Sequence, residues 1–179
     1  MQAIGEVVEF WRTAGPARWF VRDAGFDETF RSRFLALHHR AACRELEHWL
    51  DSADGALALQ ILLDQFPRNC FRGSGHSFAT DGLARHYAER TLEQGLDQPL
   101  EPALRAFIYL PFEHAEDLQY QDLAVALFER LGDAQYLQYA EVHRDVIRRF
   151  GRFPHRNAVL GRISTEEELR FLADGGFAG

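Results

Sequence analysis

The sequence contains no lysine, so all 20 of its basic residues are arginines, and these are outnumbered by 27 acidic residues. The net charge of -7 disfavours nucleic-acid binding, because an acidic chain gains nothing from general attraction to phosphate backbones. Each arginine remains charged even when buried, and its planar guanidinium suits paired contacts with a carboxylate or a phosphate. We therefore expect arginine–carboxylate pairs to dominate the polar interactions.

Cysteines and long apolar runs are also scarce. Cys43 and Cys70 fall in no Cys-x-x-Cys or Cys/His spacing, which excludes a disulfide framework and a cysteine-based metal site. The most apolar stretch, residues 56–63, contains Gln60 and is followed by Asp64, so it is too short to span a membrane. The first residues lack the basic region of a secretory signal. We expect a cytoplasmic protein with no membrane segment.

Apolar residues recur at helical spacing along almost the whole chain, and no alternating stretch indicates a strand. We predict helices over residues 27–50, 54–66, 80–94, 102–111, 115–131 and 134–150, and a short one after a capping box at Ser164 and Glu167. A chain of 179 residues can bury one core, so residues 1–179 are predicted to form a single all-α domain of seven or eight antiparallel helices. The pattern alone leaves a closed bundle and a superhelix open.

Three segments are dense in polar residues: 63–69 with 71–73, 110–117, and 150–157 with 160–162. The first and third share the frame Phe-Pro-(His)-Arg-Asn at the end of an apolar helix. We expect proline to end each helix there, with arginine complementing the negative end of the helix dipole. These residues would then have the structural role of fixing helix ends.

The charges of the last third of the chain are sorted by sign. Residues 113–133 contain six acids and one arginine, whereas residues 143–163 contain six arginines and one aspartate. Because these segments form neighbouring helices with their exit loop, we expect them to pair with each other.

A functional interpretation uses the same side chains as a binding site for a small anion. The candidate residues are Arg68, Asn69, Arg72, Glu113, His114, Asp117, Arg152, His155, Arg156 and Asn157. If these converge on one centre, they form a concave site for a carboxylate or a phosphate. If residues 113–117 are helical, Asp117 can also orient His114 as an acid or base, as a hydrolytic enzyme would require. The sequence has no G-x-S-x-G nucleophile motif.

The sequence predicts no metal site and no cofactor. Ligand types are present in Glu113, His114, Glu116, Asp117, His143 and His155, but no H-E-x-x-H or paired E-x-x-H spacing occurs. His143, beside two valines in mid-helix, fits a core histidine.

Several motifs together resemble one bacterial family. They are Leu-Asp-Gln-Phe-Pro-Arg-Asn at 63–69, Ala-Thr-Asp at 79–81, Leu-Pro-Phe-Glu-His-Ala-Glu-Asp at 110–117 and Gly-Arg-Phe-Pro-His-Arg-Asn at 151–157, with Glu-Phe-Trp at 9–11 and Ser-Thr-Glu-Glu at 164–167. In this order and spacing the chain resembles the bacterial domain-of-unknown-function family 924. The resemblance implies a tetratricopeptide-like all-α superhelix and carries over no catalytic residue, although no regular 34-residue repeat is visible.

The leading hypothesis is a binding or interaction module for an unknown protein or a small anionic ligand. The alternative is a hydrolase-like enzyme or small-ligand binder that uses the same cluster on an anionic substrate. An exposed aromatic surface would permit a homodimer.

Overall fold

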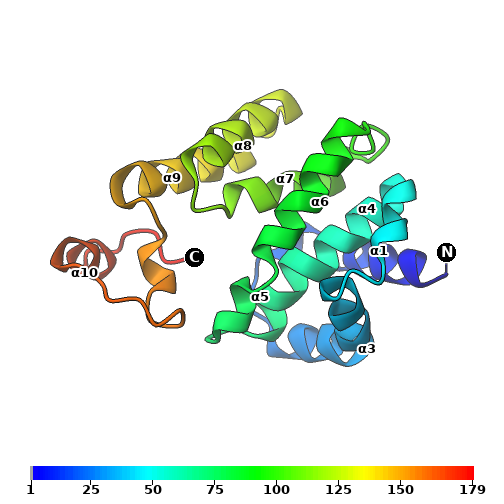
Figure 1. Cartoon of the computed structure of the whole chain (residues 1–179), viewed down its shortest axis with the longest axis horizontal. Coiled ribbons are helices and arrows are strands. Elements are labelled where there is room, and N and C mark those ends of the chain that lie inside the picture. Colours follow the sequence, from blue (N-terminus) through cyan, green and yellow to red (C-terminus); the bar gives the residue numbers. More distant parts are fainter. Residues whose placement is uncertain (1) are drawn as a thin grey trace. The chain divides into compact units, whose positions relative to one another are not determined.

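A computed structural model describes residues 2–179 and is helical throughout, with no strand in this range (Figure 1). The all-α prediction is confirmed. The chain forms two compact units, which are described separately. The N-terminal unit comprises residues up to 72 and residues 76–111, and the C-terminal unit comprises residues 73–75 and 112–179. The single domain stays a prediction.

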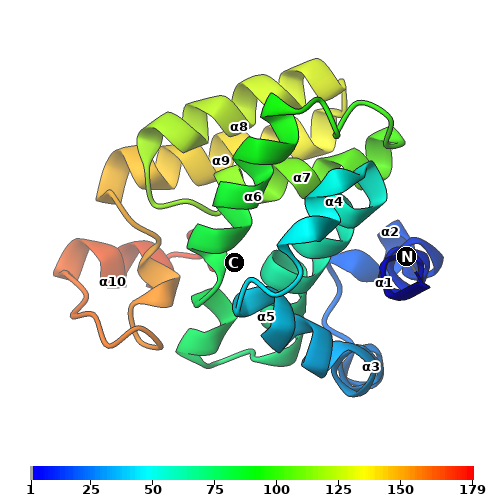
Figure 2. The same cartoon turned by 45° about the vertical axis from the view of Figure 1, so that its right-hand side comes forward.

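The N-terminal unit is built around one buried helical rod. Its elements are α1 (Gln2–Ala14), α2 (Pro16–Trp19), α3 (Ala24–Ala42), η1 (Glu47–Asp51), α4 (Ala53–Gln60), η2 (Ile61–Gln65), α5 (Phe66–Cys70), α6 (Asp81–Glu93) and most of both η3 (Gly75–Phe78) and α7 (Pro102–Glu113). Every residue from Gly55 to Pro67 is buried. Such a segment must be covered on all sides, and α1 and α6 both contact α4 (Figure 2).

The predicted helix over residues 27–50 is wrong at both ends. The carboxylate of Asp23 accepts hydrogen bonds from two backbone N–H groups of the first turn, so the helix starts at Ala24. It ends at Ala42, because Arg44 adopts a left-handed conformation with φ of 64°. The N–H of Glu45 bonds to the carbonyl of Arg40, which closes the helix as a Schellman motif.

Pro67 does not end its helix, contrary to expectation. The helix begins after Ser52, whose hydroxyl caps it, two residues before the predicted start at Asp54, and continues through a π-helical turn, η2, to Cys70. Within this turn the N–H of Phe66 bonds to the carbonyl of Ile61, five residues earlier.

Two side chains from other helices compensate for the missing N–H of Pro67. An N–H at this position would bond to the carbonyl of Leu63 in an α-helix or of Leu62 in a π-helix. The imidazole Nδ1 of His38 donates to the carbonyl of Leu62 at 2.9 Å, and the hydroxyl of Thr80 donates to the carbonyl of Leu63. The proline is therefore tolerated inside a buried helix because both carbonyls have donors from elsewhere.

The C-terminal unit contains the antiparallel pair α8 (Leu118–Leu131) and α9 (Ala134–Phe150), which lie side by side in both views (Figures 1 and 2). The predicted turn between them is confirmed: Gly132 has φ of 78°, and the carboxylate of Asp133 caps α9. α9 ends at Gly151, also as predicted. A short turn, η4 (Pro154–Arg156), and α10 (Glu166–Ala173) complete the unit.

The capping box before α10 is one residue later than predicted. Thr165 accepts from the N–H of Glu168, and the carboxylate of Glu168 accepts from the N–H of Thr165. Within residues 2–179, no helix combines the length and the apolar character needed to cross a bilayer.

Candidate functional site

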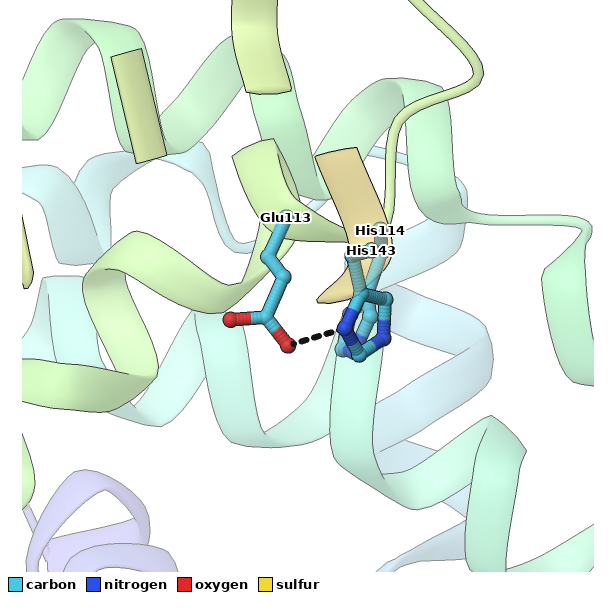
Figure 3. A group of neighbouring side chains, drawn as sticks. All are labelled: Glu113, His114 and His143. Carbon is cyan, nitrogen blue, oxygen red and sulfur yellow. Dashed lines mark ion pairs between the residues drawn. The ribbon is translucent and has the colours of Figure 1, made fainter. Parts of the chain in front are cut away.

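A buried carboxylate and a buried imidazole meet in the C-terminal unit (Figure 3). Glu113, the last residue of α7, places its Oε1 3.2 Å from Nδ1 of His143, in the middle of α9. The same Nδ1 lies 2.8 Å from the carbonyl oxygen of Tyr139. Both oxygens are acceptors, so Nδ1 carries the ring proton. The contact fixes the tautomer and the orientation of the ring.

His114 brings a second imidazole to this contact. It follows Glu113 directly and is half-buried. Glu113, His114 and His143 each place one potential metal-ligand atom within 4.8 Å of the other two. The sequence spacing did not reveal this group, because the end of one helix and the middle of another supply it and no helical ligand motif is involved.

Aromatic rings wall this group on one side. The ring of Phe153 meets His143 edge to face at 5.5 Å between centroids, and the ring of Phe177 lies 4.3 Å from His143. His155, one of the predicted site residues, contacts both phenylalanine rings. The predicted residues His114 and His155 therefore belong to one neighbourhood, together with His143.

Burial sets the charge of His143. Desolvation is the largest cause that lowers its pKa to about 3, and the charge of His114 lowers the pKa further, while the bond to the Tyr139 carbonyl opposes the shift. Weaker repulsion comes from Arg156 and His155. The imidazole of His143 is consequently neutral at pH 7.

Arg156 is buried and packs against Phe153, one of the two phenylalanines that contact His143. Its guanidinium carbon lies 4.4 Å from the ring centroid of Phe153. Beside it, Glu116 accepts from the N–H of Phe153 at 2.8 Å and from both Nη atoms of Arg162, at 2.6 and 2.9 Å. Burial opposes ionisation of Glu116, but these donors prevail and its pKa is lowered. This network fixes the loop that follows α9.

The predicted pairing between the acidic and the basic segment is confirmed in part. Glu116 binds Arg162, and Asp122 lies 3.3 Å from Arg148. Arg152 instead binds Glu168, at the start of α10. Asn157 also forms a hydrogen bond close to the start of α10: its Nδ2 donates to the hydroxyl of Ser164 at 3.0 Å. Arg152 and Asn157 thus hold the loop to α10.

The helical premise for the orientation of His114 by Asp117 is not met. α7 ends at Glu113 and α8 starts at Leu118, so Asp117 lies between helices. Its carboxylate accepts from the N–H of Gln119 at 2.8 Å and caps α8.

The remaining candidates lie in the N-terminal unit and have partners there. Arg68 donates to both oxygens of Asp81, at 2.8 and 3.0 Å. Asn69 and Arg72 both bond to the carboxylate of Asp27, at 2.8 and 3.1 Å. Their convergence with the C-terminal candidates on one centre stays a prediction.

Asn69 and Arg72 line a hollow of about 390 Å³ in the N-terminal unit. Arg22 and Arg31 line it as well, so three arginines border the same hollow. Cys70 is also on its wall, but burial and the charge of Asp27 raise the pKa of its thiol to about 12. At neutral pH this thiol is not a nucleophile.

A second hollow, of about 760 Å³, lies between α1 and α3. Phe10 and Phe26 contribute apolar surface to it, and Arg18 and Arg33 line it with Glu6 and Glu9, so its charges are mixed. None of the predicted site residues lines it.

Comparisons with known proteins concern family and fold. The model of a family described as "Bacterial protein of unknown function (DUF924)" matches residues 7–176. The solved structure of a protein of unknown function from Agrobacterium tumefaciens is 50% identical and superposes with a TM-score of 0.95, covering 97% of this chain and 98% of that chain. No curated protein matches the sequence.

Proposed function

The chain belongs to the bacterial family DUF924, as its motifs indicated, and from its own geometry we propose that it is a binding module for a small anionic ligand. The observation that carries this proposal is the hollow of about 390 Å³ lined by Arg22, Arg31, Arg72 and Asn69. Its volume lies within the range of about 300 to 1,000 Å³ that is common for small-molecule sites.

The charges on the wall of this hollow favour an anion. The wall contains three arginines and two acidic residues, Asp27 and Glu28, so positive charge is in excess. Arg72 bonds to Asp27, and Arg31 donates to the carbonyl of Cys70. Each guanidinium has five N–H donors, so these single contacts leave donors for a carboxylate or a phosphate.

Other arginines of the chain have a structural role instead. Arg68, Arg152 and Arg162 each bind a carboxylate with two donors and tie segments together. Such pairs give these three arginines a structural role. The tetratricopeptide-like superhelix, the cytoplasmic location and a homodimer remain further parts of the proposal.

The anion proposal is tested by thermal-shift measurements with phosphate, dicarboxylates and nucleotides. A ligand at 100 times its Kd should stabilise the protein by about 2.7 kcal/mol, which raises Tm by roughly 5 to 11 °C for a chain of this size. Arg22→Ala changes an exposed side chain and should remove most of the shift, whereas Arg130→Ala, in the other unit, should leave it unchanged. Silence across the ligands, or equal shifts in both variants, contradicts the proposal.

A hydrolase-like enzyme is the second candidate, and the Glu113–His143 contact favours it. A carboxylate that holds Nδ1–H of an imidazole is the arrangement that orients a general base. The expected observation is slow hydrolysis of simple esters or phosphoesters that is lost in His143→Ala. Hydrolysis that persists in this variant excludes the assignment.

A further inference from the structure

The group formed by Glu113, His114 and His143 is independent of the anion-binding hollow and offers a different chemistry. Glu113 and His143 are buried, and His114 is half-buried. Their three potential ligand atoms lie within 4.8 Å of one another, and Figure 3 shows the carboxylate of Glu113 directed at the imidazole of His143.

The separation of two of these atoms matches that of two ligands on one ion. Metal bonds to imidazole nitrogen and carboxylate oxygen are about 2.0 to 2.2 Å long, so two ligands on one ion lie about 2.8 to 3.6 Å apart at octahedral or tetrahedral angles. Oε1 of Glu113 and Nδ1 of His143 are 3.2 Å apart. Any pair on one ion must lie within about 4.4 Å, and the three atoms already lie within 4.8 Å of one another, so at most a small movement is needed.

The proton on Nδ1 of His143 marks a position that suits a cation. This proton lies between a nitrogen and two oxygens, those of Glu113 and of the Tyr139 backbone. An ion that replaces it meets the same atoms, while the ring proton moves to Nε2 and the imidazole stays neutral. No net charge on His143 has to change for this exchange.

We propose that Glu113, His114 and His143 bind a divalent transition-metal ion of the Zn²⁺ class. Two imidazoles and one carboxylate are typical ligands of Zn²⁺, Co²⁺ and related ions, whereas Ca²⁺ and Mg²⁺ require oxygen ligands. Three protein ligands leave one coordination position for water, which is the pattern of reactive rather than purely structural sites.

The surroundings are compatible with such an ion. Phe153 and Phe177 pack against His143 and limit the access of water from their side. Arg156 and His155 are the neighbouring groups that can carry positive charge, and the carboxylate of Glu113 offsets part of it. A bound ion would therefore attract an anion, such as hydroxide, to its open position.

Titration of the metal-free full-length chain with Co²⁺, followed by visible absorption, tests the proposal directly. A Cys43→Ser background removes the exposed thiol, which is a competing metal ligand. We expect saturation at one ion per chain and displacement by Zn²⁺. Glu113→Gln and His114→Ala should each weaken binding at least 10-fold, whereas His48→Ala, an exposed histidine of the other unit, should not.

Loss of metal binding must be distinguished from loss of folding. Glu113→Gln preserves shape and His114→Ala changes a half-buried ring, so the proposal does not depend on whether His143→Ala folds; circular dichroism and Tm verify the fold of each variant. The absence of saturable binding overturns the proposal, as does an affinity of Glu113→Gln and His114→Ala equal to that of His48→Ala. Neither result affects the anion proposal, whose site lies in the N-terminal unit.

Discussion

Arg152 binds both carboxylate oxygens of Glu168, at 2.6 and 2.8 Å. The same carboxylate accepts from the backbone N–H of Thr165 at 2.7 Å. The bond from Arg152 is the largest cause that lowers the pKa of Glu168 to about 2, and it outweighs the opposing effect of burial. One side chain thus joins the loop after α9 to the first turn of α10.

This carboxylate should make stability depend on acid pH. Its pKa is depressed in the folded state, so its contribution is complete above the ordinary value of 4.5 and is lost as pH falls toward 2. The difference in Tm between the wild type and Glu168→Gln should be constant from pH 7 to about 5 and shrink below that. A difference that does not change between pH 5 and 2.5 would show that the pair is not responsible.

Arg156→Ala should destabilise the protein by about 3 kcal/mol, lowering Tm by roughly 6 to 12 °C. The side chain is buried against Phe153, so its removal leaves a gap and exposes an apolar ring. Arg156→Lys keeps the charge but not the planar stacking and should recover only part of the loss. An unchanged Tm in Arg156→Ala would contradict the structural role and make the residue available for ligand binding.

Thr80→Val should show how much the Thr80 hydroxyl stabilises the protein by donating to a carbonyl that Pro67 leaves without its helical partner. The valine fills the same volume but cannot donate to the carbonyl of Leu63, so we expect a loss of about 1 to 3 kcal/mol in denaturant unfolding. Thr80→Ser retains the donor and should lose less. As a control, Thr29→Val removes an exposed hydroxyl that bonds within its own helix, and a loss as large as that of Thr80→Val would refute the explanation.

His143 should remain neutral between pH 8 and 4 in the metal-free protein, because its pKa is lowered to about 3. Since the unfolded chain binds a proton here below about pH 6.5, this residue favours unfolding as pH falls from that value toward 3. Nitrogen-15 NMR of the ring should show a neutral imidazole with the proton on Nδ1 throughout. A titration midpoint near 6 would contradict both the burial and the tautomer.

Local signals were sufficient wherever a turn depends on its own residues. Gly132, Asp133 and Gly151 mark the ends of α8 and α9 in the sequence because a left-handed turn and an N-cap each need a particular residue type. The helix through Pro67 and the helix end at Arg44 were missed for the opposite reason. The first depends on donors from distant helices, and the second places a non-glycine residue at positive φ.

The candidate sites show the same limit. The sequence indicated His114, His155 and Arg156 as polar residues of interest, and all three lie near His143 in the structure. It did not indicate the contact between Glu113 and His143, because their separation along the chain carries no motif. Arg22 and Arg31 were missed for a similar reason: they lie beside Arg72 only because α3 and the residues before it pack near α5 and the residues after it.

The π-helical turn at Ile61–Gln65 also sets the direction in which the side chains that follow it in the helix point. An α-helix rotates by about 100° per residue, so one additional residue in a turn changes the angular phase of all that follow by that amount. Removing a single residue from this turn would swing Arg68 and Asn69 away from Asp81 and Asp27 together. A one-residue deletion here should therefore damage the N-terminal unit more than any single substitution at the same positions.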